Sequence, residues 1–428
     1  MELKKYKLGE LLDVKRGASL AGEYYATTGN YIRLTCGNFD YQNNSFKLNT
    51  SKDNLFYTGP VRKEFIMKKG DIITPLTEQA IGLLGSTAII PEDDKYIQSQ
   101  DVAKIICNED LLYPMFAYYL ISSETVKKQL SAAAQQTKIR HTSPDKIKDC
   151  VVWIPDLKEQ KHIASILSDL DKKTTLNRAI NQNLEALAKQ LYDYWFVQFD
   201  FPDEEGKPYK SSGGAMAWNE KLKRDIPASW KTVVVDDVAE VFNGATPSTG
   251  DEQNYGGDIV WITPKDLSDQ KQKFVYHGER NITQAGYDSC STHLLPINTV
   301  LMSSRAPIGL LAIAKKELCT NQGFKSFVPK EDRIATYLYY YLQFHIKQIE
   351  QLGTGTTFKE VSREDVLKFP ILKPSDVVLD LWENRVSAIN DKQLELQKEN
   401  ENLVKQRDEL LPLLMNGQVS LNSDLSHD

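Results

Sequence analysis

The second half of the chain repeats much of the first half. Residues 8–17 (LGELLDVKRG) return as residues 235–244 (VDDVAEVFNG), and residues 32–35 and 70–73 return as residues 260–263 and 298–301. The separation between the copies is nearly constant and covers about half of the 428 residues, whereas solenoid repeats run at roughly 20–50 residues. The sequence therefore predicts a duplicated domain, and we expect the second copy to bind a variant of whatever the first copy binds.

A long heptad pattern follows each copy, and its apolar positions are separated by alternating steps of three and four residues. An amphipathic helix on a globular core would show a similar pattern, but about four to five matching heptads in both halves favour a pair of long helices. The apolar members of this seam are Ile163, Leu167, Leu170, Leu184 and Leu191 in the first copy and Val386, Ile389, Leu396, Leu403 and Leu410 in the second.

The order of these segments predicts an α+β protein with two similar mixed α/β domains and two long coiled-coil helices. The second domain follows the end of the first helix, so the second helix returns along the first, which predicts antiparallel pairing and a pseudo-twofold arrangement. The expected boundaries are 1–155 for the first domain, 156–202 for the first long helix, 203–229 for a linker, 230–374 for the second domain, 375–420 for the second long helix and 421–428 for a polar tail.

Composition excludes several classes of protein. No apolar run reaches the roughly 18 residues of a membrane span, and the first residues lack the apolar core of a secretory signal. The five cysteines are scattered without a Cys-x-x-Cys pair, which favours free thiols in the cytoplasm over a zinc site. The formal net charge is −6, so any contact with nucleic acid has to be a local patch rather than the whole surface.

Four stretches of the sequence carry a family resemblance. Residues 227–247 and 261–267 (WITPKDL) resemble the opening of a target-recognition domain and its next block. Residues 154–164 (IPDLKEQKHIA) and 191–201 (LYDYWFVQFDF) resemble the entry to a central conserved helix and its exit. Their order and duplication resemble the specificity subunit of type I restriction–modification systems, although residues 374–378 lack the Glu-Gln pair present at Glu159 and Gln160.

This resemblance implies a DNA-binding role. Each domain would be a target-recognition domain that reads one half of a split, asymmetric sequence in double-stranded DNA, and the paired helices would set the gap. Two adenine-N6 methyltransferase subunits would dock on the chain, and restriction subunits would complete an ATP-dependent endonuclease. S-adenosylmethionine, ATP and Mg would belong to those partners, so the chain itself would be a non-catalytic subunit with no cofactor.

Catalytic motifs are absent from the sequence. No Asn-Pro-Pro of an adenine methyltransferase and no P-loop occurs, and the histidines lack metal-ligand spacing. Residues 353–358 are Gly-rich but follow a predicted helix and lack a third Gly, which is typical of a helix C-terminal turn. We therefore expect no catalytic, cofactor or metal site.

Candidate DNA contacts are the side chains that read bases or hold phosphates, namely Arg, Lys, Asn, Gln, Ser, Thr and His in predicted loops. For each of them the alternative interpretation is an ordinary solvated surface group. The candidates are Lys15, Arg16, Arg33, Asn38, Gln79, Lys138, Arg140 and His141 in the first copy and Asn243, Thr246, Lys265, Arg305, Lys325, Lys359 and Arg363 in the second.

Four large aromatic residues lie at the exit of the first long helix, and two interpretations of them remain open. They would either pack on the neighbouring domain or anchor a methyltransferase subunit, because aromatic side chains are enriched at the centres of protein interfaces. These residues are Trp195, Phe196, Phe199 and Phe201.

Two other functions remain as alternatives. A methyltransferase with unrecognised motifs would bind S-adenosylmethionine in isolation. A coiled-coil scaffold for protein partners alone would show no sequence-dependent DNA binding in its assembled complex.

Overall fold

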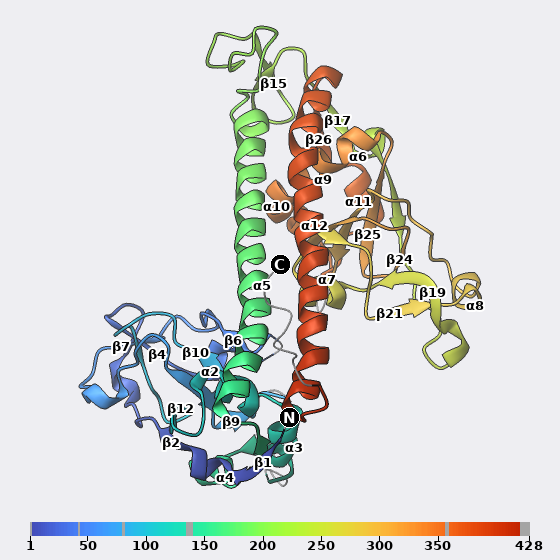
Figure 1. The fold of residues 1–428 in the computed structure, drawn as a ribbon. Helices are drawn as coiled ribbons and strands as arrows, with labels where there is room; N and C mark the ends of the chain where they lie inside the picture. Colours follow the sequence, from blue (N-terminus) through green and yellow to red (C-terminus); the bar gives the residue numbers. More distant parts are fainter. Residues whose placement is uncertain (1, 42, 79–81, 134–139, 356–358, 420–428) are drawn as a thin grey trace, which may run out of the picture. The chain divides into compact units, whose positions relative to one another are not determined.

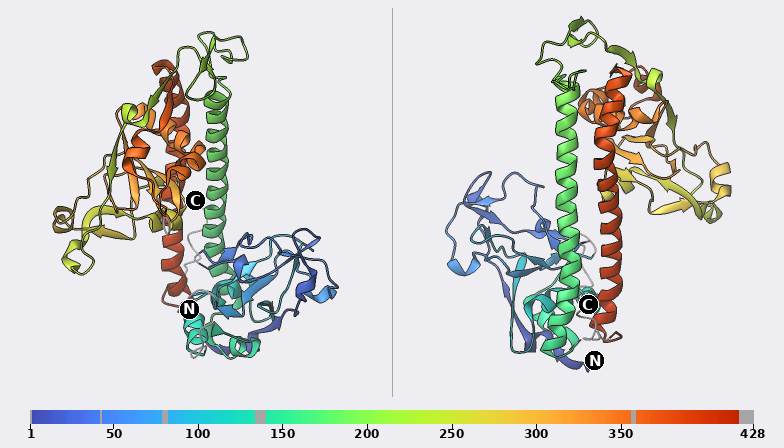
Figure 2. Two further views of the ribbon diagram at one scale, coloured as in Figure 1. Left: turned by 180° about the vertical axis from the view of Figure 1, so that it is seen from behind. Right: turned by 45° about the horizontal axis from the view of Figure 1, so that its top comes forward.

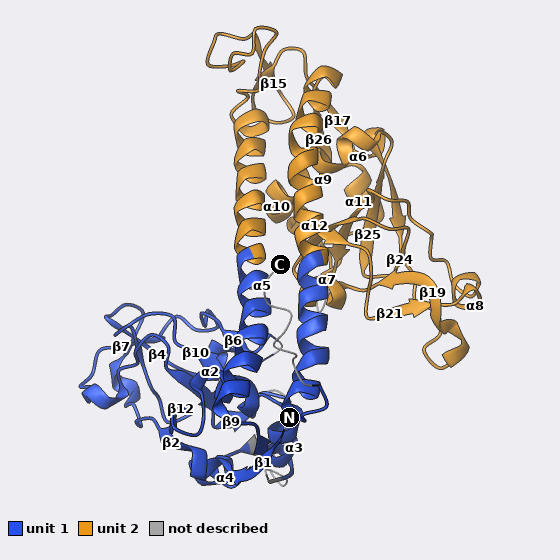
Figure 3. Ribbon diagram, in the orientation of Figure 1, with its two compact units in different colours: residues 1–176, 399–428 blue, residues 177–398 orange. Residues whose placement is uncertain are grey.

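A computed structural model describes residues 2–41, 43–78, 82–133, 140–355 and 359–419 (Figure 1). The chain forms two compact units, which are coloured separately in Figure 3. Unit 1 comprises Met1–Leu176 with Glu399–Asp428, and unit 2 comprises Asn177–Lys398. The division passes through both long helices, because the two ends of each helix pack against different globular parts.

Unit 1 is built on a four-stranded antiparallel sheet with the order β10-β8-β12-β2. A smaller sheet has the order β11-β4-β7-β3, and the pairs β1–β14, β13–β9 and β5–β6 complete the unit. The strands are β1 (Lys4–Lys7), β2 (Leu12–Arg16), β3 (Tyr25–Ala26), β4 (Tyr31–Arg33), β5 (Phe39–Asp40), β6 (Ser45–Phe46), β7 (Phe56–Tyr57), β8 (Ile72–Pro75), β9 (Thr77–Glu78), β10 (Ala88–Ile89), β11 (Tyr96–Ile97), β12 (Val102–Cys107), β13 (Arg140–His141) and β14 (Val151–Ile154).

The short helices of unit 1 pack against its main sheet and share one hydrophobic core with it. Pro114 occupies the first turn of its helix, where a missing N–H costs no hydrogen bond, and six of the following residues are buried. Ser143 accepts a hydrogen bond from the Lys146 amide and so caps the helix that it precedes. The short helices are α1 (Leu8–Leu11), α2 (Pro114–Ile121), α3 (Glu124–Ala133) and α4 (Pro144–Lys148).

Unit 2 repeats this plan with longer strands. Its main sheet has the order β18-β25-β22-β23-β20, and a second sheet has the order β21-β19-β24. The pairs β17–β26 and β15–β16 complete the unit. The strands are β15 (Met216–Asn219), β16 (Arg224–Pro227), β17 (Lys231–Val234), β18 (Ala239–Asn243), β19 (Tyr255–Ile262), β20 (Phe274–Val275), β21 (Arg280–Ile282), β22 (Val300–Ser304), β23 (Ile308–Ala314), β24 (Cys319–Thr320), β25 (Phe324–Pro329) and β26 (Pro370–Lys373).

The duplication seen in the sequence is present in the strand order. The run β10-β8-β12-β2 of unit 1 corresponds to β23-β22-β25-β18 of unit 2, and the pair β1–β14 corresponds to β17–β26. Each copy also places a capped short helix before its last strand, α4 in unit 1 and α11 in unit 2. The short helices of unit 2 are α6 (Val235–Val238), α7 (Pro264–Gln270), α8 (Gln284–Asp288), α9 (Ala335–Phe344), α10 (Ile346–Leu352) and α11 (Arg363–Leu367).

The two long helices are α5 (Leu157–Tyr192) and α12 (Asp376–Met415). In unit 1 the start of α5 contacts the end of α12, and Asp171 pairs with Arg407 at 3.1 Å. In unit 2 the end of α5 contacts the start of α12, and Gln393 donates to Glu185 at 3.1 Å. Within each unit the two helix segments therefore run in opposite directions, side by side in every view (Figure 1 and Figure 2).

The heptad seam lies in the interior at its two ends. Ile163, Leu167, Val386 and Leu396 are buried, so these four positions face protein rather than solvent. The other six seam residues, at positions 170, 184, 191, 389, 403 and 410, are half-buried. Among the described residues, no helix has the length and apolar content needed to cross a membrane.

The four aromatic residues at the exit of α5 pack inside unit 2. Phe196, in the π-helical segment Asp193–Val197, has its ring centroid 4.7 Å from that of Tyr337 and 5.0 Å from that of Trp382. Trp195, Phe199 and Phe201 are buried in the same core. Side chains this deeply buried offer no surface to a partner, so of the two interpretations the structure supports packing within the unit.

Replacing Phe196 with Ala should lower the free energy of unfolding of unit 2 by about 3–5 kcal/mol, because it removes a buried ring and leaves a cavity. Urea unfolding followed by circular dichroism measures this change. Trp218→Ala is the matched control, since Trp218 is 58% exposed and its loss should change stability by less than about 0.5 kcal/mol. Equal midpoints for the two variants would contradict the assigned packing.

Candidate nucleic-acid interface

Three segments of unit 2 meet at one end of its main sheet. Asn243, the last residue of β18, stands opposite Lys325 of β25 in the strand register. Arg305 directly follows β22, and the Val361 amide donates to the Ser304 carbonyl oxygen at 3.1 Å, which brings Glu360 beside both strands. Residues far apart in the sequence thus form one polar cluster.

Glu360 holds the cations of this cluster in place. Its Oε1 lies 3.2 Å from the Lys325 Nζ, and its Oε2 lies 4.0 Å from an Arg305 guanidinium nitrogen. The Lys325 side chain is only 5% exposed, so its charge depends on this carboxylate, whereas the Glu360 side chain is 41% exposed. Two cations around one carboxylate leave the cluster positive, as contact with phosphate requires.

The remaining candidates of the second copy lie around this cluster, except for one. Thr246 hydrogen-bonds to Gln322, and the Arg363 Nε donates to the Val241 carbonyl oxygen at 2.6 Å. Lys359 is exposed and adjoins Glu360. Lys265, on α7, pairs instead with Glu279 at 2.7 Å on the surface.

The corresponding end of the sheet in unit 1 carries different side chains. His141 stands opposite Thr77 in the β13–β9 pair, and the His141 Nδ1 lies 3.4 Å from the Thr77 Oγ1. Arg16 ends β2 and donates from Nε to the Gln100 carbonyl oxygen at 2.8 Å. Lys15, beside it, is exposed. This end of unit 1 therefore also presents cations and hydrogen-bonding groups.

Other first-copy candidates lie elsewhere. The backbone of Arg140 pairs with Glu78, whereas Gln79 and Lys138 lie outside the described residues. Asn38 is fully buried, accepting a hydrogen bond from the Thr35 amide at 2.9 Å and donating one to the Lys47 carbonyl oxygen at 3.2 Å. Both ends of its amide stabilise a turn, so we no longer retain Asn38 as a DNA contact.

Arg33 is also used inside unit 1. Its guanidinium carbon lies 3.8 Å from the Tyr25 ring centroid, and the side chain donates to the Asn54 carbonyl oxygen at 3.4 Å. Arg33 is 9% exposed, and its stacking on an aromatic face gives it a structural role. We therefore also remove Arg33 from the proposed DNA contacts.

The sequence search did not include Thr77, Gln322 and Glu360. Carboxylates such as Glu360 were not among the residue types considered, whereas threonine and glutamine were, and no local pattern singled out Thr77 or Gln322. One signal was available: Glu360 lies two residues before the capping Ser362, as His141 lies two residues before the capping Ser143.

Among the described residues, no three His, Cys, Asp or Glu side chains gather as a metal site.

A family model of the type I restriction modification DNA specificity domain matches residues 1–186 and 227–376. These two segments hold well over half of the chain. The chain belongs to this family. Its members include specificity subunits, which recognise DNA within a restriction–modification system and are generally not catalytic themselves.

Individual relatives agree with this assignment. Over 182 residues the chain is 38% identical to the type I restriction enzyme MjaIX specificity subunit of Methanocaldococcus jannaschii, a match that spans only 42% of either chain. Over 97% of its length it is 26% identical to the HindI specificity subunit of Haemophilus influenzae, of which it covers 99%. A crystal structure of the S subunit of a type I restriction–modification system from M. genitalium has a similar fold, with a TM-score of 0.61, 16% identity and coverage of 99% of this chain and 97% of that chain.

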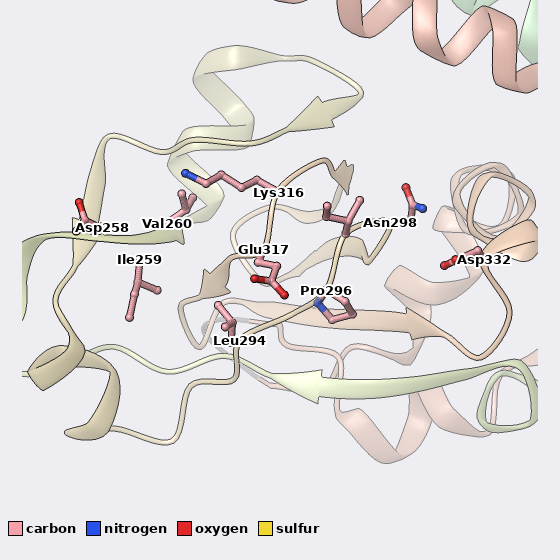
Figure 4. Close-up of a pocket in the computed structure, with 10 residues that line it drawn as sticks. Asp258, Ile259, Val260, Leu294, Pro296, Asn298, Lys316, Glu317 and Asp332 are labelled. Atoms are coloured by element: carbon pink, nitrogen blue, oxygen red, sulfur yellow. The ribbon is translucent and has the colours of Figure 1, made fainter.

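The opposite end of the main sheet in unit 2 has a different chemistry. A groove there is lined by Asp258, Ile259, Val260, Leu294, Pro296, Ile297, Asn298, Lys316, Glu317 and Asp332 (Figure 4). Asn298 lies just before β22 and Arg305 just after it, so the groove is about 20 Å from Arg305 at 3.3 Å per residue. Three carboxylates and one lysine make this end of the specificity subunit unfavourable for the DNA backbone.

A buried lysine joins the domain of unit 2 to both of its helix segments. The Lys273 Nζ donates to the Tyr340 hydroxyl at 2.7 Å and to the Asn390 side chain of α12 at 2.8 Å. It also lies 3.3 Å from the Glu185 carboxylate of α5, which accepts from Tyr340 at 3.1 Å. We call these four side chains the Lys273 cluster.

Unit 1 has a similar group, the Arg407 cluster. Tyr119 donates to the Asp171 carboxylate of α5 at 2.6 Å, and Arg407 of α12 pairs with that carboxylate at 3.1 Å. The Arg407 side chain is 8% exposed. In each unit a tyrosine of the globular domain thus meets an acidic residue of α5 beside one buried cation, which fixes the domain on the helices of its own unit.

Burial lowers the pKa of Lys273 to about 8, against the opposing effect of Glu185. The unfolded chain has a lysine pKa of about 10.5, so between these values the unfolded state binds more protons. The free energy of unfolding of unit 2 should therefore rise as the pH increases from about 8 to about 9.5, below the range in which tyrosines titrate.

Urea unfolding at about pH 7.5 and about pH 9.5 checks this prediction. Tryptophan fluorescence reports on unit 2, which holds every tryptophan except Trp153. Lys273→Met should remove this part of the pH dependence. The assignment would be wrong if wild type and variant gained the same stability between the two pH values.

Proposed function

We propose that each unit reads one half of a split, asymmetric DNA sequence through the end of its main sheet. We call this place the strand-end site, formed by Asn243, Arg305, Lys325 and Glu360 in unit 2 and by Arg16, Thr77 and His141 in unit 1. The observation that carries the proposal is the gathering of Arg305, Lys325 and Glu360 from distant segments at one end of the sheet, while three carboxylates and one lysine line the groove at the opposite end.

The chemistry of the strand-end site suits both parts of DNA recognition. Arg305, whose side chain is 39% exposed, can neutralise a phosphate and so position the duplex, and the buried Lys325 supports the site through Glu360. Exposed hydrogen-bonding side chains read base edges. Because the two copies carry different side chains here, the two half-sites should differ in sequence. The long helices would set the gap: a helix of this length spans about 50 Å, or on the order of 12–15 base pairs.

Partner subunits would supply the catalysis. We infer that two adenine-N6 methyltransferase subunits dock on the chain and that restriction subunits join them to form an ATP-dependent endonuclease in the cytoplasm. S-adenosylmethionine, ATP and Mg would act in those partners. This assignment rests on family membership and on the end-to-end similarity to the HindI specificity subunit.

We further propose a docking surface for a methyltransferase at the end of α5 within unit 2. Ile180 and Leu187 of α5 and Tyr194 of the π-helical segment that follows it recur every seven residues, and all three are exposed. They form a second apolar stripe beside the heptad seam, and an apolar stripe of this kind would bury itself against a further helix. A helix of the methyltransferase subunit is the occupant that we propose.

The reading of DNA is tested in cells that produce the chain with its cognate methyltransferase subunit. A single-molecule map of N6-methyladenine should show a split, asymmetric motif that disappears when only this chain is deleted. An unchanged map would contradict the proposal and favour the coiled-coil scaffold.

Docking is tested by Leu187→Glu, which places a charge in the apolar stripe. The variant should pull down at least tenfold less methyltransferase subunit, because an unpaired buried charge opposes association by several kcal/mol. Leu48→Glu is the matched control, since Leu48 is 63% exposed on unit 1 and should leave assembly unchanged. Wild-type assembly by Leu187→Glu would exclude this surface.

A further inference from the structure

His141 in unit 1 and Glu360 in unit 2 occupy equivalent places in the two copies. In unit 1 the Thr142 amide donates to the Leu76 carbonyl oxygen at 2.9 Å, and in unit 2 the Val361 amide donates to the Ser304 carbonyl oxygen at 3.1 Å. The residue before each amide is His141 in unit 1 and Glu360 in unit 2. A serine that caps the next helix follows in both cases, so the two residues hold the same place between the central strand and the capped helix.

The neighbours of these residues are equivalent too. Thr77 lies two residues after the central strand β8, Arg305 lies directly after β22, and they contact His141 and Glu360 respectively. The His141 Nδ1 lies 3.4 Å from the Thr77 Oγ1, and the Glu360 Oε2 lies 4.0 Å from the Arg305 guanidinium. One backbone position therefore presents an imidazole in one copy and a carboxylate in the other.

The two side chains select different partners. A carboxylate only accepts hydrogen bonds, so on a base edge it favours an exocyclic amine, which is N4 of cytosine or N6 of adenine. An imidazole can donate from one nitrogen, which suits the N7 and O6 acceptors of a purine. Arg305 and Lys325 offset the charge of Glu360, so a carboxylate here need not repel the DNA backbone.

We propose that His141 and Glu360 are specificity-determining residues, each of which selects one base in a different half-site. Glu360 accepts from the exocyclic amine of cytosine or adenine, and His141 donates to a purine acceptor. The inference rests on the proposed function, in which each unit reads its own half-site.

Two single substitutions test this inference. Glu360→Gln keeps the shape of the side chain but adds a donor, and His141→Asn removes the ring. Each is assembled with the methyltransferase subunit and its methylation motif is mapped. Glu360→Gln should lose discrimination by roughly ten- to a hundredfold at one base of one half-site, and the base that is relaxed, cytosine or adenine, identifies the partner. His141→Asn should do the same in the other half-site only.

Glu331→Gln is the matched control for the carboxylate. The Glu331 side chain is 44% exposed and is paired with Arg333, but it follows β25 at the far end of the sheet, so the motif should stay unchanged. His141→Asn tests the inference independently of folding in unit 2, because His141 is exposed and belongs to unit 1.

The outcomes separate this inference from the proposed function. A wild-type complex without any split motif would overturn the proposed function. A split wild-type motif that both variants keep, or a uniform loss of methylation with an intact motif, would overturn the inference, because Glu360 and His141 would then have only a structural role.

Discussion

The burial of single charges between the globular domain and the long helices is the constraint on which each unit depends. Lys273 in unit 2 and Arg407 in unit 1 are both nearly inaccessible to solvent. A buried cation adds little net stability, but removing one partner leaves an uncompensated charge at a cost of about 3–5 kcal/mol. A slip of α5 by one residue would separate Lys273 from Glu185, so we infer that these clusters specify the register of domain on helix within each unit.

The two ends of the main sheet in unit 2 differ in charge. One end holds Arg305, Lys325 and Glu360, and the other holds the groove with three carboxylates. With a formal net charge of −6, the chain attracts DNA only where cations are concentrated. We propose that the separation of charge along β22 orients the domain toward DNA without a basic composition overall.

Duplication followed by divergence explains why the copies share a fold but differ at the strand-end site. The strand order and the serine caps are retained, because backbone hydrogen bonds and helix caps constrain them in both copies. The cationic side chain of the strand-end site comes from β2 in unit 1, as Arg16, but from β25 in unit 2, as Lys325. At a second position, His141 of unit 1 corresponds to Glu360 of unit 2. Such exchanges leave the core unaltered and change only the chemistry presented at the sheet end.

The sequence by itself determined the duplication, the α+β class, the heptad helices and the family, because these depend on periodicity and motif order along the chain. It named Arg305 and Lys325 separately, but only the tertiary structure decided that they meet at Glu360. It also named Asn38 and Trp195, whose burial no local pattern reveals. Arg305 and Glu360 are more than fifty residues apart in the sequence, and only packing in three dimensions brings them together. The burial of Asn38 and Trp195 likewise depends on the segments that pack around them.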